Sequence, residues 1–129
     1  HRDTFTGITD RDRSLTTRRF SDLWTEIESQ ELNEGQRMEA LGKEFRTPGH
    51  IPVCRESPGG LANRQGHTEL AVAVARMANL PPIVIGAEML QPDGDSALSV
   101  EDARKYGEIH GIPFLSGNDI LVASGLKGE

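Results

Sequence analysis

The residues best suited to chemistry in this chain lie side by side in the segment Arg64–Thr68, which reads Arg-Gln-Gly-His-Thr. The mostly apolar run 70–78 follows, so the spacing predicts a helix that starts here. A helix start offers unpaired N–H groups at the positive end of the helix dipole, which suits a phosphate. Arg64 and Thr68 add donors, and His67 adds a metal ligand or an acid–base group. From the residues alone, a phosphate site and a solvated helix start are equally open interpretations.

Two more residues are candidates for proton transfer. Glu88 lies near the end of the apolar run 83–90, where burial of a carboxylate would favour its neutral form and suit it to acid–base work. The alternative is a strand-end carboxylate that reaches solvent or pairs with an arginine. His50 follows the rigid turn Pro48–Gly49, and its alternative is an ordinary surface histidine.

The elements that must position these residues follow from hydrophobic spacing. Apolar side chains at Phe20, Leu23, Trp24 and Ile27 predict an amphipathic helix over residues 13–29. Further helices are predicted over 67–79, over 99–110 with Gly111 as the stop, and as a last turn around 119–122 capped by Ser116, before a frayed tail at 124–129. A short helical turn is allowed near Met38 and Leu41.

The remaining apolar runs predict strands. They are the short extended segment 51–54, a buried strand over 83–90 and a short strand over 112–115, with residues 4–6 as the end of another. Strands that alternate with helices indicate an α/β (or α+β) domain, a layered α/β/α structure with a mixed sheet.

Composition narrows the class of protein. A length of 129 residues fits one domain, and a net charge of −6 argues against nucleic-acid binding. No apolar run has membrane-spanning length. The single Cys54 excludes an internal disulfide and fits a reducing cytosol. The chain begins at His1 rather than Met, which leaves a fragment, a processed product and a renumbered part of a longer protein as open interpretations.

Several motifs, taken together and in this order, resemble those of the 3,4-dihydroxy-2-butanone 4-phosphate synthases, most closely the archaeal form. They are the segments 6–13 (TGITDRDR), 46–51 (RTPGHI), 59–61 (GGL) and 64–69 (RQGHTE), followed by the run that ends at Glu88. The resemblance covers nearly the whole chain. It implies a cytoplasmic lyase of riboflavin biosynthesis that converts D-ribulose 5-phosphate to 3,4-dihydroxy-2-butanone 4-phosphate and formate.

The resemblance also implies roles for individual residues. The run that matches the family's substrate-binding segment is Arg64, Gln65, Gly66, His67 and Thr68. Within it, Arg64 and Thr68 lie on the phosphate side, and His67 matches the ligand of a Mg²⁺ (or Mn²⁺) ion. His50 and Glu88 match positions required for catalysis, with Glu88 also in contact with substrate. Thr6 and Asp10 belong to a loop that lines the site, and family members are homodimers.

One family feature is absent from the sequence as given. The family carries an acidic, Arg-Glu-rich loop that supplies the metal's carboxylate ligand, and no such loop precedes Thr6. The resemblance therefore implies that residues 1–129 are the C-terminal part of a longer synthase domain. A chain complete as given would therefore have weak or no activity, since Mg²⁺ prefers oxygen ligands. The alternative function is a catalytically silent fragment that binds a sugar phosphate or serves a structural role.

Overall fold

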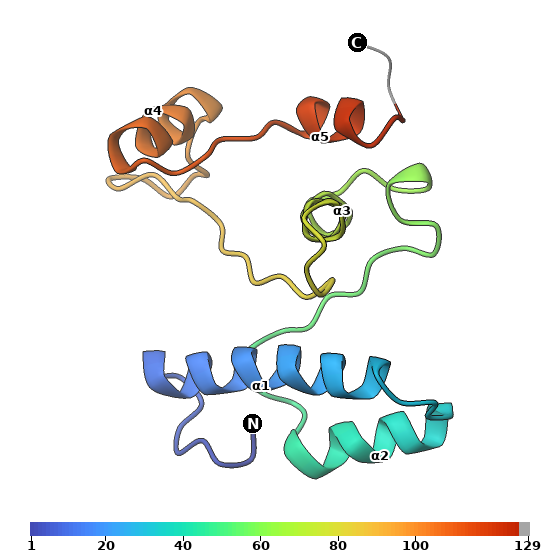
Figure 1. Ribbon diagram of the computed structural model, residues 1–129. Coiled ribbons are helices and arrows are strands. Elements are labelled where there is room, and N and C mark those ends of the chain that lie inside the picture. Colours follow the sequence, from blue (N-terminus) through green and yellow to red (C-terminus); the bar gives the residue numbers. More distant parts are fainter. Residues whose placement is uncertain (127–129) are drawn as a thin grey trace. The chain divides into compact units, whose positions relative to one another are not determined.

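A computed structural model describes residues 1–126 and shows a helical chain (Figure 1). Its elements are α1 (Asp10–Glu28), α2 (Glu34–Glu44), the 3₁₀-helix η1 (Gly60–Ala62), α3 (His67–Met77), α4 (Val100–His110) and α5 (Gly117–Ala123). The contacts divide the chain into two compact units. The first comprises His1–Arg55 with Asn79–Ile83, and the second comprises Glu56–Ala78 with the residues from Val84 onward. The expected membership of a single longer domain stays a prediction.

The predicted mixed sheet is wrong. Within residues 1–126 there is no strand, and the sole β-bridge joins Leu90 to Ala97. The expected buried strand 83–90 is irregular and exposed, with Ile85 at 69% and Leu90 at 65% of full exposure. The segments 4–6, 51–54 and 112–115 also form no strands. A strand forms only when a second segment lies beside it and exchanges backbone hydrogen bonds. Apart from the single bridge at Leu90, these segments have no such neighbour in the described part of the chain.

The helices of the first unit start where local capping places them. α1 begins three residues before the predicted boundary because the Thr9 side chain accepts a hydrogen bond from the Asp12 N–H at 3.2 Å. The short turn expected near Met38 is the helix α2, 11 residues long. Asn33 and Gln36 form a reciprocal capping box at its start, with both hydrogen bonds at 3.0 Å.

The helices of the second unit confirm the sequence predictions more closely. α3 is followed by Asn79 in a left-handed conformation (φ 55°), which ends it as expected. Ser99 caps the start of α4, and Gly111 ends it at φ 65°. Ser116 caps α5, which is longer than the predicted single turn. Part of the expected frayed tail, residues 127–129, lies outside the described residues. No helix within residues 1–126 combines the length and apolar character needed to cross a membrane.

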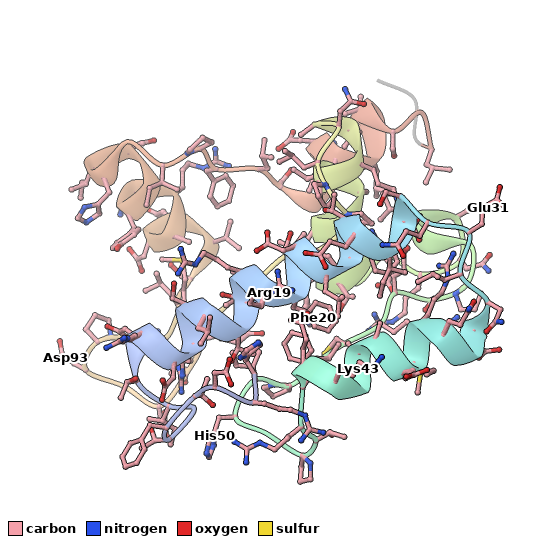
Figure 2. All side chains as sticks on the ribbon, turned by 60° about the horizontal axis from the view of Figure 1, so that its bottom comes forward. Arg19, Phe20, Glu31, Lys43, His50 and Asp93 are labelled. Carbon is pink, nitrogen blue, oxygen red and sulfur yellow. The ribbon has the colours of Figure 1, made fainter. Side chains whose placement is uncertain are left out.

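In the first unit, α1 packs against α2 through both apolar and charged contacts. Leu23 is buried, and the ring of Phe20 meets that of Phe45 edge to face at 5.5 Å. Arg19 makes two hydrogen bonds to the Glu44 carboxylate, at 2.6 and 3.0 Å. Arg19 and Phe20 lie next to each other on the same helix (Figure 2). These contacts join the two helices into a hairpin.

In the second unit, α3 is the central element. It contacts η1 on one side and α5 on another. The buried apolar residues are Leu61 of η1, Ala75 of α3 and Ile120 of α5. The one large side chain with less than 2% exposure among the described residues is Glu69, a carboxylate in the first turn of α3. This buried carboxylate directly follows Arg64–Thr68, the segment that the sequence predicts to be functional.

Candidate functional site

The predicted site residues divide between the two units. Thr6, Asp10 and His50 belong to the first unit, whereas Arg64–Thr68 and Glu88 belong to the second.

In the first unit, the loop before α1 is folded around the carboxylate of Asp12. One oxygen, Oδ2, accepts hydrogen bonds from the Thr6 N–H at 3.0 Å, the Thr6 hydroxyl at 3.2 Å and the Gly7 N–H at 2.9 Å. These donors, that of Gly7 foremost, lower the pKa of Asp12 below its ordinary value of 3.8. Asp12 also lies in the first turn of α1, where the helix dipole favours a negative charge. The Thr6 loop is therefore held by an ionised carboxylate.

The same loop contacts the predicted catalytic histidine. Gly7 has φ +75°, and a Cβ atom built on it would lie 3.2 Å from Cδ2 of His50. The imidazole thus lies against Gly7, the one residue of the loop that lacks a side chain. Thr6 and His50 are distant in sequence, and the structure brings their segments together. Sequence reasoning predicted both residues but not the contact.

Asp10, the carboxylate predicted to line this site, is exposed at the start of α1. The residue that organises the loop is Asp12, which sequence reasoning missed. A local signal was present, because Thr9 and Asp12 have the spacing of a helix cap and its third residue. The role of Asp10 stays a prediction.

In the second unit, Glu69 joins three parts of the chain. Its Oε1 accepts the Ser57 N–H at 2.9 Å, and its Oε2 pairs with Nη1 of Arg64 at 2.7 Å. The Ser57 N–H, the N–H of Glu69 itself and the Arg64 guanidinium lower the pKa of Glu69 to about 2, although burial opposes the shift. Glu69 is also a residue that sequence reasoning did not assign. Its burial depends on the loop at Ser57, so the sequence around α3 carries no direct signal for it.

The Arg64–Glu69 ion pair lies directly over Gly66. A Cβ atom on Gly66 would lie 2.5 Å from Nη1 of Arg64 and 2.9 Å from Oε2 of Glu69. Gly66 is the N-cap of α3 and provides no side-chain hydrogen bond, so the N–H groups of His67 and Thr68 have no acceptor in the described residues. The Arg64 side chain is 56% exposed while Glu69 is sealed beneath it. This helix start can receive an anion from solvent.

The two remaining candidates of the second unit are exposed. His67 is the first residue of α3. Glu88 lies on the irregular segment after α3 and makes no ion pair or hydrogen bond to Arg64–Thr68 within residues 1–126. The burial that the sequence argument for Glu88 required is absent.

The described side chains do not provide the donor set of a Mg²⁺ ion. Mg²⁺ requires near-octahedral geometry with oxygen ligands. Across the described chain, no three side chains of His, Cys, Asp or Glu come close enough to hold a metal ion together. His67 alone is one nitrogen ligand, so the residues placed here do not form a complete Mg²⁺ site.

Comparison with known proteins accounts for the order of these segments. The family model described as 3,4-dihydroxy-2-butanone 4-phosphate synthase matches residues 1–123. The chain belongs to this synthase family. Similar curated relatives carry the same description. In Methanosarcina mazei the identity is 46% over 123 residues, in Archaeoglobus fulgidus 44% over 121, and in Saccharomyces cerevisiae 32% over 114.

Coverage of the relatives is partial. The matches include 95%, 94% and 88% of this chain but 47%, 48% and 48% of the respective relatives. The chain thus spans about half the length of the curated relatives it matches.

Proposed function

We propose that the native protein is a lyase of riboflavin biosynthesis that converts D-ribulose 5-phosphate to 3,4-dihydroxy-2-butanone 4-phosphate and formate. The proposal rests on the anion-binding geometry at the start of α3, found in a chain of this family. There the exposed Arg64, bound to Glu69 through one nitrogen, lies beside the N–H groups of His67 and Thr68, which have no acceptor within residues 1–126. Such a site suits the dianionic phosphate of the substrate.

Substrate binding is assigned to the start of α3. The exposed donors of Arg64 and the N–H groups of His67 and Thr68 would bind the phosphate oxygens, with the Thr68 hydroxyl as a further donor. Gln65 and Gly66 complete the segment. Binding at the phosphate, remote from the reacting carbons, supplies orientation for the chemical steps.

The reaction balances without an oxidant, because the carbons of the five-carbon sugar phosphate are divided between a four-carbon product and formate. It proceeds through an enediol, a shift of the carbon skeleton and loss of one carbon, and each step moves protons beside a carbonyl. His50 and Glu88 are the proposed acid–base groups. Thr6 and Asp10 are proposed to line the site, with the loop fixed by Asp12.

Three further assignments stay predictions. His67 is proposed as one ligand of a Mg²⁺ (or Mn²⁺) ion, and no chemical step is assigned to that ion because the described residues do not complete its site. The homodimer and the cytoplasmic location rest on the family resemblance alone.

The test is formate release from D-ribulose 5-phosphate by the full-length native protein with Mg²⁺. We expect turnover by the wild type and a loss of at least about 100-fold in kcat for Glu88→Ala, in the range of removing an acid–base group. His67→Ala, which removes the proposed metal ligand, should also lower kcat strongly. Arg64→Ala is expected to weaken phosphate binding. Full turnover by both His67→Ala and Glu88→Ala would contradict the site assignment.

The alternative function predicts a different result in the same assay. A catalytically silent protein would bind ribulose 5-phosphate, or serve only a structural role, without release of formate. Calorimetry with the substrate distinguishes a binding protein from a structural one.

A further inference from the structure

We propose that Glu69 is a positioning residue that fixes the Arg64 guanidinium for recognition of the substrate phosphate. The inference rests on the proposed function, because it assigns Arg64 to the phosphate. Glu69 itself is sealed from solvent, with its side chain at 0% exposure, so it acts through Arg64 rather than on the substrate.

The geometry divides the Arg64 side chain into a fixed end and a free end. Nη1 is held by Oε2 of Glu69 at 2.7 Å. No other hydrogen bond or ion pair of the guanidinium is formed within residues 1–126, and the side chain is 56% exposed. An arginine bound at one nitrogen keeps its remaining donors in a fixed fork, which suits a phosphate. Without the carboxylate, the long side chain would be ordered only when the ligand binds.

Glu69 is in turn rigid. The Ser57 N–H donates a hydrogen bond of 2.9 Å to its second oxygen, Oε1. A buried carboxylate with two different partners has one orientation available to it. The position of Arg64 is thereby tied to the loop before η1 as well as to α3.

Gly66 supplies the space for this arrangement. A methyl group at Gly66 would lie 2.5 Å from the Arg64 nitrogen and 2.9 Å from the Glu69 oxygen, both inside van der Waals contact. Substitution at Gly66 would therefore displace the ion pair without removing either charged group from the chain. This provides a second way to disturb the same contact.

The second unit also contains a matched control. Glu56 forms an ion pair with Arg76, and its carboxylate is 23% exposed. Like Glu69, Glu56 has a lowered pKa, caused first by its arginine partner. Glu56→Gln removes an arginine-paired carboxylate from the same unit without touching Arg64.

The experiment is a double-mutant cycle in the full-length protein with wild type, Glu69→Gln, Arg64→Ala and the double variant. Calorimetry measures the Kd of inorganic phosphate and of ribulose 5-phosphate, and formate release measures KM and kcat. We expect Glu69→Gln to raise Kd and KM about tenfold, the lower end for losing a hydrogen bond between charged groups, with kcat changed less than about twofold. In the Arg64→Ala background, Glu69→Gln should have no further effect, and Glu56→Gln should leave both constants unchanged.

The inference would be overturned if Glu69→Gln raised Kd by the same factor in the wild type and in the Arg64→Ala variant. Unchanged Kd and KM in a folded Glu69→Gln protein would also overturn it. If circular dichroism shows that Glu69→Gln is unfolded, Gly66→Ala takes its place in the cycle with the same expected and contrary results. If the wild type binds ribulose 5-phosphate but releases no formate, the proposed lyase activity is contradicted. The role of Glu69 is still decided in that case, because the Kd values of the four proteins are measured by calorimetry. If formate is released but the effects of Glu69→Gln and Arg64→Ala on Kd are additive, the lyase activity stands and the proposed role of Glu69 is contradicted.

Discussion

The backbone N–H of Gly7 donates a hydrogen bond to the carboxylate of Asp12 across 2.9 Å. This bond closes the loop before α1 onto the first turn of the helix. Because the same Gly7 lies against the imidazole of His50, the helix start, the loop and the predicted catalytic residue form one connected arrangement. A substitution of Asp12 should therefore change the position of His50, although the two side chains are not in contact.

Asp12→Asn tests this connection. One carboxylate oxygen accepts three hydrogen bonds from Thr6 and Gly7, and a neutral amide oxygen accepts them more weakly. We expect the Tm to fall by on the order of 5 °C and kcat for formate release to fall about fivefold. Thermal unfolding followed by circular dichroism and the formate assay measure the two effects.

Asp10→Asn is the matched control for stability. Asp10 lies in the same first turn of α1 but is exposed and accepts no hydrogen bond from the loop in the described structure. Its substitution should leave the Tm within about 1 °C of wild type, since exposed substitutions usually have small effects. Equal losses of Tm for the two variants would mean that helix-start charge, not the loop contacts, carries the effect.

Gly7→Ala should impair catalysis beyond its cost in stability. The added methyl group would lie 3.2 Å from His50, and the residue would be held at φ +75°, which costs roughly 1–2 kcal/mol for a residue with a side chain. We expect kcat to fall about tenfold, because small displacements of a catalytic group have large effects on rate.

Gly111→Ala separates the two causes. Gly111 has a similar φ of +65°, but nothing lies within 4 Å of the position its Cβ would take. It should lose a similar free energy of unfolding while kcat stays unchanged. A similar fall in kcat for Gly111→Ala would show that backbone strain alone explains the Gly7 result.

The stability of the protein should depend on Glu69 in acid. Its pKa is about 2 in the folded chain against an ordinary value of 4.5, so the unfolded chain takes up the proton first as the pH falls. The contribution of Glu69 to stability is thus complete above about pH 4.5 and is lost as the pH falls toward about 2. The difference in Tm between wild type and Glu69→Gln should shrink across this window. A difference that stays constant from pH 6 to pH 2 would contradict the assignment of the low pKa to Glu69.

The parts of the fold that the sequence predicted are those set by neighbouring residues. Ser99 and Ser116 cap the helices expected after them, and Asn79 and Gly111 end helices at the expected places. Capping bonds form within a few residues, so they can be recognised in one sequence.

The parts that could not be predicted depend on distant residues. The apolar run 83–90 has the composition of a buried strand, but pairing requires a neighbouring segment, and sequence composition does not say whether one is there. In the sequence, Glu69 looks like an ordinary carboxylate in the first turn of a helix. Its burial is set by Ser57 and Arg64, and only the folded chain shows that they meet.

Two helical glycines should respond oppositely to alanine. On Gly107 of α4, a Cβ atom would lie 2.8 Å from the carbonyl oxygen of Ile112, whereas Gly42 of α2 has nothing within 4 Å. Gly42→Ala should stabilise the protein by about 0.5–1 kcal/mol, because alanine favours the helix more than glycine does. Gly107→Ala should destabilise it by about 1–3 kcal/mol, the usual cost of overpacking. Urea unfolding of both variants measures the difference. In the structure, the Ile112 N–H donates a hydrogen bond of 2.8 Å to the Gly107 carbonyl and so holds the turn against α4. Stabilisation by Gly107→Ala would mean that the backbone at Ile112 is not held there.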